Sequence, residues 1–290
     1  MRGIITADWH LREDRPRCRI DEDWIATQKK ALERIYTEAG NRNYNVYVVG
    51  DLFHRSTEYR MVRLVQQLAE MLDKDGLHLY FIAGNHDCLY HLSSNLDRSA
   101  IGLLQGTKNV YFMNDLVNVS APNFGEPVNK DMPIVFEHRL VFPDKKSLPP
   151  NVEAVTAEDM LEMYPNAEWI FTGDYHHNFH YEKNGRHVVN SGCLLRQATD
   201  MKNYDCGFYC VNTDIDEVEW ISIGDNEPLV DDSYIIKQEE REERLANFID
   251  SISKTTSVSL DYLDNVQKAL LANDIPSELK EMINEIIHNR

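Results

Sequence analysis

Residues 170 to 180 read IFTGDYHHNFH and place several groups with metal-binding chemistry close together. Asp174 and His176 follow directly after an apolar run and a glycine. Carboxylate oxygens and imidazole nitrogens are common protein ligands of divalent metal ions. We therefore predict that Asp174 and His176 belong to a metal site. The adjacent His177 and His180 are expected to be loop residues without a role in it.

Four other segments share this design, in which a short apolar run is followed at once by Asp, Asn or His. They read RGIITADWH, NVYVVGDLFH, LYFIAGNHD and PIVFEH. Continuous apolar runs of this length are typical of strands that are buried on both faces. The residues at or beyond their ends with ligand or acid–base chemistry are Asp8, His10, Asp51, His54, Asn85, His86, Asp87 and His138.

Helical patterns separate the first three of these runs. Residues 21–40 begin with aspartates suited to helix capping and end on a glycine, and residues 57–76 repeat that pattern. Alternating strands and helices predict α/β layers. Because ligands in such folds lie beyond the carboxyl ends of the strands, we expect all five polar tips to converge on one site.

The pattern changes in the second half of the chain. Three shorter strands, RHVVNSG, CGFYCVN and EVEWISIG, are expected to complete a second sheet. Three helices are then predicted over 234–253, 259–274 and 276–289. We therefore divide the chain into a catalytic domain, 1–230, and a short helical extension, 231–290, which could cap the core or dock a partner.

Composition narrows the class of protein. The net charge of −18 argues against a broad basic surface for nucleic acid, although metal ions could supply positive charge at a site. The N-terminus does not resemble a signal peptide, and no apolar stretch reaches the length of a membrane span. We expect a cytoplasmic protein without membrane contact. Its five cysteines form no C-x-x-C pair and should be reduced: Cys18, Cys88, Cys193, Cys206 and Cys210.

The order D-x-H, G-D, G-N-H-D, H, G-x-x-H resembles that of the calcineurin-like metallophosphoesterase superfamily, over roughly residues 1 to 225. The resemblance implies an αββα sandwich, two β-sheets flanked by helices, that holds two divalent metal ions. Within the superfamily, GDLFH and the later NSGCLLRQ are most similar to SbcD-type DNA exonuclease subunits and to smaller phage-type ones. Those relatives act in DNA repair and recombination.

The resemblance also implies the metal ligands: Asp8, His10 and His176 on the first metal, Asn85, His138 and Asp174 on the second, and Asp51 bridging both. The family usually writes the last motif G-H-x-H, so this chain departs from it by placing Asp174 where a histidine is expected. Asp is itself a good ligand for hard cations. It should favour Mn²⁺, or Mg²⁺, over zinc.

Further residues acquire catalytic or substrate roles from the resemblance. His86 aligns with the catalytic histidine, and Asp87 would fix its tautomer. His54 is nuclease-like and would contact phosphate or lie in the metal shell. Arg55 falls where phosphatases place a phosphate-contacting arginine, so both substrate contact and a surface position stay open. Arg196 lies in a turn that contacts substrate in the relatives.

We predict a two-metal phosphodiesterase, first of all a DNA exonuclease or endonuclease that forms the nuclease subunit of an SbcCD-like complex. Its partners would be DNA and an SbcC-like coiled-coil ATPase. Formation of a homodimer stays open. A second hypothesis is a phosphomonoesterase or a phosphodiesterase of small molecules or cyclic nucleotides. A third, a scaffold that has lost its metals, is disfavoured because every ligand position is filled.

Overall fold

A computed structural model describes residues 1–148, 154–224, 230–231, 233, 241, 244, 266, 270 and 275–288. The chain divides into two compact units, Met1–Asp231 and Asp232–Arg290. Each unit is described below by itself.

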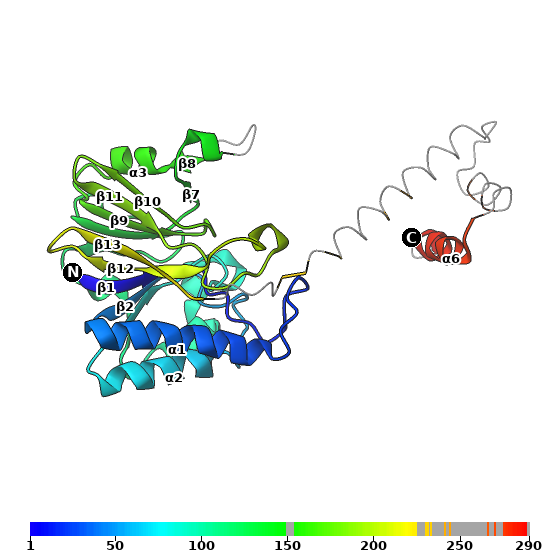
Figure 1. Cartoon of the computed structure of the whole chain (residues 1–290), viewed down its shortest axis with the longest axis horizontal. Coiled ribbons are helices and arrows are strands. Elements are labelled where there is room, and N and C mark those ends of the chain that lie inside the picture. The colour runs from blue at the N-terminus through cyan, green and yellow to red at the C-terminus, as the bar shows by residue number, and fades with distance from the viewer. Residues whose placement is uncertain are drawn as a thin grey trace. The chain divides into compact units, whose positions relative to one another are not determined.

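The first sheet of the larger unit has the strand order β13-β12-β1-β2-β3-β4 (Figure 1). Its strands are β1 Arg2–Thr6, β2 Asn45–Val49, β3 Leu79–Ile82, β4 Val110–Phe112, β12 Gly207–Asn212 and β13 Glu217–Ser222. Strands β1 to β4 run parallel, and β12 pairs antiparallel with both β1 and β13. The parallel strands therefore end on the same edge of the sheet.

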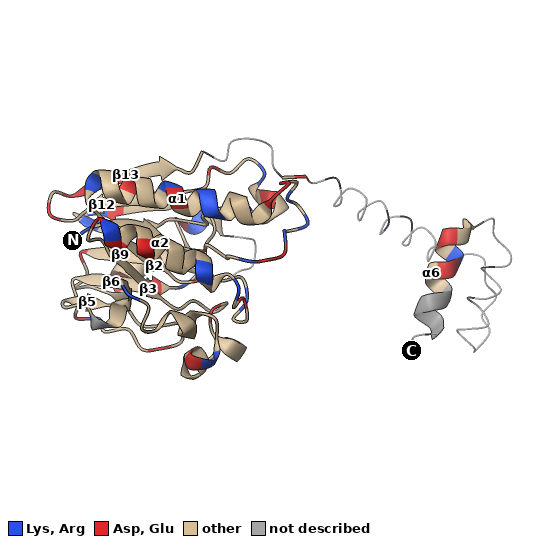
Figure 2. Cartoon of the chain, turned by 90° about the horizontal axis from the view of Figure 1, so that it is seen from below, with Lys and Arg blue, Asp and Glu red and all other residues tan. Residues whose placement is uncertain are grey.

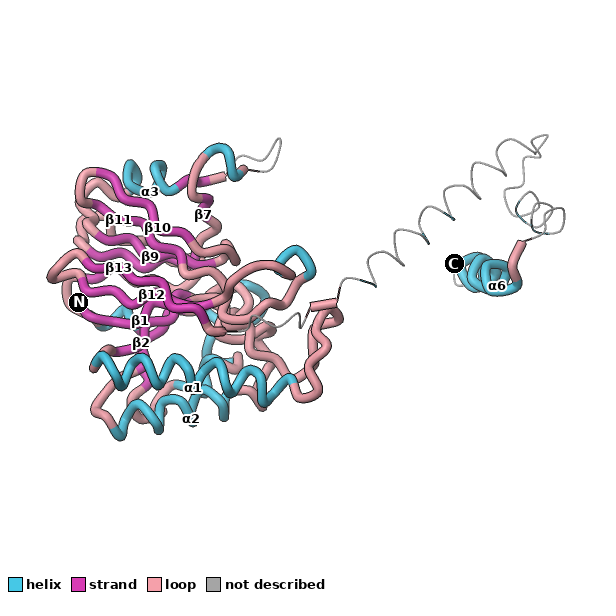
Figure 3. The backbone as a smooth tube through the Cα atoms, viewed as in Figure 1, coloured by secondary structure: helices cyan, strands magenta, loops and turns pink. Residues whose placement is uncertain are grey.

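Helices α1 (Trp24–Arg42) and α2 (Val62–Lys74) lie against the outer face of this sheet (Figures 1 and 3). Helix α1 begins where the Asp23 carboxylate accepts the backbone N–H of Ala26 at 2.9 Å. Its cap lies three residues later than predicted, because Asn43 rather than Gly40 adopts the left-handed conformation. Asn tolerates that conformation better than most residues, since its short amide can bond locally.

The second sheet has the order β10-β11-β9-β6-β5. Its strands are β5 Val119–Ser120, β6 Ile134–His138, β9 Trp169–Gly173, β10 Phe179–Lys183 and β11 Arg186–Asn190. Helix α3 (Ala157–Met163) packs on its outer face, next to the small pair β7 (Val141–Phe142) and β8 (Val155–Thr156). A capping box between Thr156 and Asp159 starts α3.

Three apolar layers hold these elements together. One lies between the first sheet and helices α1 and α2, a second between the two sheets, and a third between the second sheet and α3. In the middle layer Ile5 and Val49 of the first sheet meet Phe136 and Phe171 of the second. Charged residues lie mainly on helices and loops, while the strands are largely uncharged (Figure 2). The predicted αββα sandwich is confirmed.

In the second unit, helix α6 spans Ser277–His288 and agrees with the helix predicted over 276–289. Within this unit Ile283 is buried with Val266 and Leu270. The helices predicted over 234–253 and 259–274 lie outside the described residues, apart from isolated positions. Among the described residues, no helix is long and apolar enough to cross a membrane.

Candidate metal centre

The polar tips of the five predicted strands meet at one edge of the sandwich. Asp8 follows β1, Asp51 follows β2, Asn85 and His86 follow β3, His138 ends β6, and Asp174 follows β9. Two groups of side chains there have ligand atoms that all lie within 4.8 Å of one another: Asp8, His10 and His176 form one, and Asp8, Asp51 and His138 form the other. The convergence expected from the sequence is therefore present.

Unusual backbone conformations direct the ligands into the site. Asp8, His10, Asp51 and Asp174 all have positive φ angles, of 49°, 42°, 53° and 77°. This left-handed region is costly for residues other than glycine and is found disproportionately at functional sites. At the end of β1 it turns both Asp8 and His10 toward the metal centre, while Trp9 between them is buried in the core on the helix side.

The first ligand group is built around two facing imidazoles. His10 Nε2 lies 3.2 Å from His176 Nε2. Burial lowers the pKa of both His10 and His176, so both rings are neutral near pH 7. A neutral imidazole has the free lone pair that a metal ion requires. The Asp8 carboxylate is fully buried and accepts the backbone N–H of Asp174 at 3.0 Å. This hydrogen bond connects the loop after β1, which carries His10, to the loop after β9, which carries His176.

The second ligand group is centred on His138. Its Nδ1 donates a hydrogen bond to the carbonyl oxygen of Val49 at 2.8 Å, which fixes the ring and leaves Nε2 facing the site. From Nε2, Oδ1 of Asn85 lies at 3.0 Å and Oδ1 of Asp174 at 4.0 Å. These side chains are the ones that the sequence assigned to the second metal.

The Asp51 carboxylate belongs to the second group and also approaches His10 of the first. Its Oδ2 atom is buried, and its nearest nitrogens, His138 Nε2 and His10 Nε2, lie 3.4 and 3.6 Å away, too far for a strong hydrogen bond. Its Oδ1 atom accepts the backbone N–H of His86 at 2.9 Å. A buried carboxylate oxygen without a hydrogen bond is costly unless a cation neutralises it. The donor set therefore fits two cations that share Asp51.

Two glycines make this close packing possible. A Cβ atom on Gly50, which has φ of 85°, would lie 2.2 Å from His138 Nδ1. A Cβ atom on Gly84 would lie 2.1 Å from Asp51 Oδ1. Both glycines belong to the motifs that the sequence singled out, G-D and G-N-H-D, and each clears the space that a ligand occupies.

His86 lies at the edge of the metal centre, but its orientation differs from the prediction. His86 Nδ1 donates to the backbone carbonyl of His54 at 2.7 Å. The Asp87 carboxylate instead accepts backbone N–H groups of Leu52, Phe53 and Gly84, at 3.2, 2.9 and 3.0 Å. The carbonyl of His54, and not Asp87, therefore fixes the tautomer of His86. Asp87 is fully buried among loop amides and connects the loop after β2 to the loop after β3.

A family model for calcineurin-like phosphoesterases matches residues 1–205. The chain belongs to the calcineurin-like phosphoesterase family. The family implies a metal-dependent hydrolase of phosphate esters, in which two divalent metal ions are typical. A comparison with curated protein sequences found no match.

Solved structures with a similar fold include TT1561 of Thermus thermophilus, with 12% identity and a TM-score of 0.47 over 77% of this phosphoesterase and 98% of that chain. A novel archaeal phosphodiesterase is similar at 13% identity and a TM-score of 0.39, over 77% and 99% of the two chains. GAP50 of Plasmodium is similar at 12% identity and a TM-score of 0.47, over 96% and 98%.

The two arginines expected to contact substrate are engaged elsewhere in this phosphoesterase. Arg55 Nε donates to Glu58 at 2.8 Å, and its guanidinium also pairs with Asp14. Arg196 is only 4% exposed and donates to the carbonyl of Lys202 at 2.7 Å. The predicted substrate contact does not fit the burial of Arg196, which anchors the loop after β11.

The remaining histidines lie in different surroundings, and His180 is on strand β10 rather than in the loop predicted for it. His54 lies with His10 and His86 in a third group of ring nitrogens within 4.8 Å of one another. His177 instead packs against the ring of Tyr204, with ring centroids 4.7 Å apart. His180 Nε2 lies 2.9 Å from His187 Nδ1. Neither His177 nor His180 belongs to any of the three groups.

Asn190 is a positioning residue that the sequence prediction did not assign. Its Nδ2 donates to the carbonyl oxygens of Tyr175 and His177, at 2.6 and 2.8 Å, and so holds the backbone on both sides of His176. The signal was present in the segment NSGCLLRQ. That segment indicated a family resemblance but not the hydrogen-bond partner of the asparagine.

Proposed function

We propose that this phosphoesterase is a two-metal phosphodiesterase whose substrate is DNA. The observation that carries the proposal is the buried Asp51 carboxylate. Its Oδ2 lies 3.4 Å from His138 Nε2 in its own ligand group and 3.6 Å from His10 Nε2 in the other. Two divalent ions bound there would supply an activated water and neutralise charge on the phosphate. Asp174, a hard oxygen ligand, favours Mn²⁺ for the second ion.

Hydrolysis then needs a proton for the leaving group. As the water oxygen bonds to phosphorus, the bond from phosphorus to the leaving oxygen breaks, and that oxygen keeps the electron pair. His86 can supply the proton, because its Nδ1 is held by the His54 carbonyl at 2.7 Å and its Nε2 stays available. The ring centroids of His86 and His10 lie 4.8 Å apart, which places the donor beside the first ligand group.

The surroundings of Arg55 support a diester over a monoester. In phosphatases an arginine at this position contacts the doubly charged phosphate. Here the Arg55 guanidinium is paired with both Glu58 and Asp14. A diester carries one negative charge and depends less on such an additional cation. This leaves phosphomonoesterase activity as the weaker of the two assignments.

The assignment to DNA is supported by the spellings GDLFH and NSGCLLRQ, which resemble SbcD-type exonuclease subunits. A role in DNA repair or recombination, with an SbcC-like ATPase docked on the C-terminal extension, follows from the same resemblance and is part of the proposal. The net charge of −18 favours the second candidate, hydrolysis of small or cyclic phosphodiesters, because it opposes contact with a long polyanion.

One set of assays separates these functions. The purified protein is incubated in Mn²⁺ with end-labelled single- and double-stranded DNA, bis-p-nitrophenyl phosphate and p-nitrophenyl phosphate, with and without an ATPase encoded beside it. We expect release of nucleotides from DNA and faster turnover of the diester than of the monoester. Turnover of the small esters without release of nucleotides from DNA would contradict the assignment to DNA. Faster turnover of the monoester than of the diester would contradict the assignment as a phosphodiesterase.

A further inference from the structure

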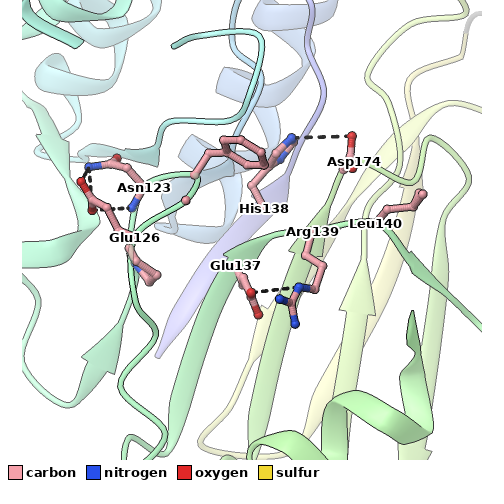
Figure 4. A pocket seen from close by; sticks show the side chains of 10 residues that line it. Asn123, Glu126, Glu137, His138, Arg139, Leu140 and Asp174 are labelled. Carbon is pink, nitrogen blue, oxygen red and sulfur yellow. Dashed lines mark hydrogen bonds and ion pairs between the residues drawn. The ribbon is translucent and has the colours of Figure 1, made fainter. Parts of the chain in front are cut away.

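A pocket of about 340 Å³ opens beside the metal centre (Figure 4). It is lined by residues 122–126, between β5 and β6, and by residues 137–140 at the end of β6. His138 and Asp174, two of the predicted ligands of the second metal, form part of its wall. A phosphate held at the metal centre therefore has one of its substituents at the mouth of this pocket.

The size of the pocket limits what this substituent can be. Pockets for small molecules range from about 300 to 1,000 Å³. At about 340 Å³ this pocket lies at the lower end of that range. It offers room for one group of nucleoside size and not for a run of several nucleotides.

Three apolar side chains also line the pocket. Phe124 and Pro122 line it, together with Leu140, which is 39% exposed. The backbone N–H of Phe124 donates to the carbonyl of Ala83 at 2.9 Å, and the Phe124 ring meets the His138 ring edge-on, with centroids 6.5 Å apart. Phe124 is thus held in place by the same strand ends that carry the ligands. Aromatic rings so placed are surfaces on which nucleobases stack.

The charges in the pocket oppose a second phosphate. Glu137 and Arg139 neutralise each other across 3.1 Å, below His138 and Asp174 in Figure 4. On another side, the Glu126 carboxylate accepts the backbone N–H of Asn123 at 3.0 Å. Within the described residues no cation forms an ion pair with Glu126. Glu126 therefore adds a local negative charge on this side of the pocket, which opposes a phosphate there and attracts hydrogen-bond donors.

From these features we infer that the pocket binds the terminal nucleoside of a nucleic acid chain while the metal centre holds the adjoining phosphate. The base stacks on Phe124, and its N–H donors face Glu126. A nucleoside at a chain end fits because no further phosphate follows it, whereas an internal nucleotide would bring one close to Glu126. Cleavage should therefore start at chain ends and release mononucleotides. This inference rests on the proposed phosphodiesterase function.

Two small diesters test the pocket without DNA. Methyl p-nitrophenyl phosphate is too small to fill it, whereas thymidine 5′-(p-nitrophenyl phosphate) carries one nucleoside. We expect kcat/KM in Mn²⁺ to be at least about tenfold higher for the thymidine ester, since stacking of one base commonly contributes that much. Phe124→Ala should lower kcat/KM far more for the thymidine ester than for the methyl ester and so remove most of this preference, and Phe124→Trp should restore it.

A matched control distinguishes stacking from packing. Phe112 also packs partly buried against the core on the helix side, but it does not line the pocket. Phe112→Ala should keep the preference for the thymidine ester. Thermal unfolding of both alanine variants checks that they fold. An equal loss on both esters in Phe124→Ala would show that Phe124 is only a packing residue and would overturn the inference.

The charge argument has its own test. A thymidine ester with an additional 3′-phosphate should be hydrolysed at least about tenfold less efficiently than the simple ester, because Glu126 repels the added charge. Glu126→Gln should reduce this discrimination. Unchanged discrimination in that variant would contradict the role of Glu126. Equal hydrolysis of the methyl and thymidine esters by the wild-type protein would overturn the pocket inference but not the proposed function. No hydrolysis of either ester would contradict the proposed function as well.

Discussion

At the scale of single residues, the site is defined by ligands on strained backbone. Asp8, His10, Asp51 and Asp174 adopt positive φ, between 42° and 77°, where most residues pay about 1–3 kcal/mol each. The surrounding loops hold them there, since the N–H groups of Asp8 and His10 donate to the carbonyls of Gly50 and Asp51 at 3.1 and 3.0 Å. These backbone hydrogen bonds therefore hold Asp8 and His10 in the conformation that directs their side chains into the site.

The role of His86 leads to the first prediction. His86→Asn should keep both metal sites, because the backbone N–H that bonds Asp51 is retained. Turnover of bis-p-nitrophenyl phosphate should fall by about 10² to 10⁴, the usual contribution of a general acid. Metal content and steady-state rates measure the two effects. His177→Asn, which alters a ring outside the ligand groups, should stay near the wild-type rate, and full activity in His86→Asn would refute the assigned role.

Asp174 leads to the second prediction. Asp174→Ala should weaken binding of the second ion by more than about tenfold. Even residues that only hydrogen-bond to a metal ligand change the metal affinity by about 10- to 100-fold when they are mutated. Asp174→His should keep activity and shift the metal preference from Mn²⁺ toward Zn²⁺. Competitive metal titration followed calorimetrically provides the measurement. Two ions bound with unchanged affinity in Asp174→Ala would show that Asp174 is not a ligand.

Side-chain chemistry was predictable from the sequence at this scale, and backbone partners were not. The polar residues after the apolar strands have recognisable ligand chemistry, and the family resemblance implied the ligand roles of Asp51 and His138. The acceptor that orients His86 is the main-chain carbonyl of His54. A carbonyl is present at every position, so no residue type signals it, and Asp87 was assigned that role only because it is adjacent in sequence.

At the scale of elements, parallel pairing brings the motifs together. Strands β1, β2 and β3 run parallel in one sheet, and β6 and β9 run parallel in the other. Continuous apolar runs made these strands recognisable from the sequence. Helix ends were less predictable, because the left-handed cap of α1 fell on Asn43 rather than on Gly40. Both residues favour that conformation, and only the packing of the chain decides between them.

A buried ion pair just before α1 leads to the third prediction. Arg19 Nε and Nη2 donate to both oxygens of Asp21, each at 2.7 Å, and the guanidinium lies over the Trp24 ring. The Arg19 and Asp21 side chains are 0% and 4% exposed. Asp21→Asn should lower the free energy of unfolding by about 3–5 kcal/mol, since it removes the buried carboxylate that pairs with the Arg19 guanidinium. Urea unfolding at pH 7 measures this.

The same pair predicts a dependence on pH. Burial acts to raise the pKa of Asp21, but the Arg19 guanidinium and the Thr27 hydroxyl outweigh it and hold the pKa below its ordinary value. A depressed carboxyl pKa stabilises the fold above the unfolded pKa, about 3.9, and that stability is lost as the pH falls through the folded pKa. The difference in free energy of unfolding between wild type and Asp21→Asn should therefore become smaller below about pH 4. A difference that stays constant down to pH 2 would contradict this.

At the scale of the whole molecule, the larger unit contains everything that the proposed chemistry needs. The three apolar layers and all the predicted ligands lie within Met1–Asp231. A domain with its own core can fold alone. The sequence analysis placed a boundary near residue 230 because the pattern of the chain changes there. The function of the extension was not predictable in the same way, since amphipathic helices suit both capping and docking.

This leads to the fourth prediction. A chain that ends at Asp231 should fold and hydrolyse bis-p-nitrophenyl phosphate with an unchanged kcat. Its last residue still donates its backbone N–H to the carbonyl of Cys18 at 2.6 Å. Circular dichroism, thermal unfolding and steady-state kinetics would compare it with the full chain. Failure to unfold cooperatively, or loss of turnover, would show that the larger unit depends on the extension.

The central claim is that two metal ions share Asp51, and it is tested most directly by anomalous diffraction from crystals of the full chain soaked in Mn²⁺. We predict two peaks about 3.5–4 Å apart, as in other two-metal phosphoesterases. One should lie among Asp8, His10 and His176, the other beside His138, and Asp51 should contact both. A single peak, or two peaks that Asp51 does not bridge, would contradict the account.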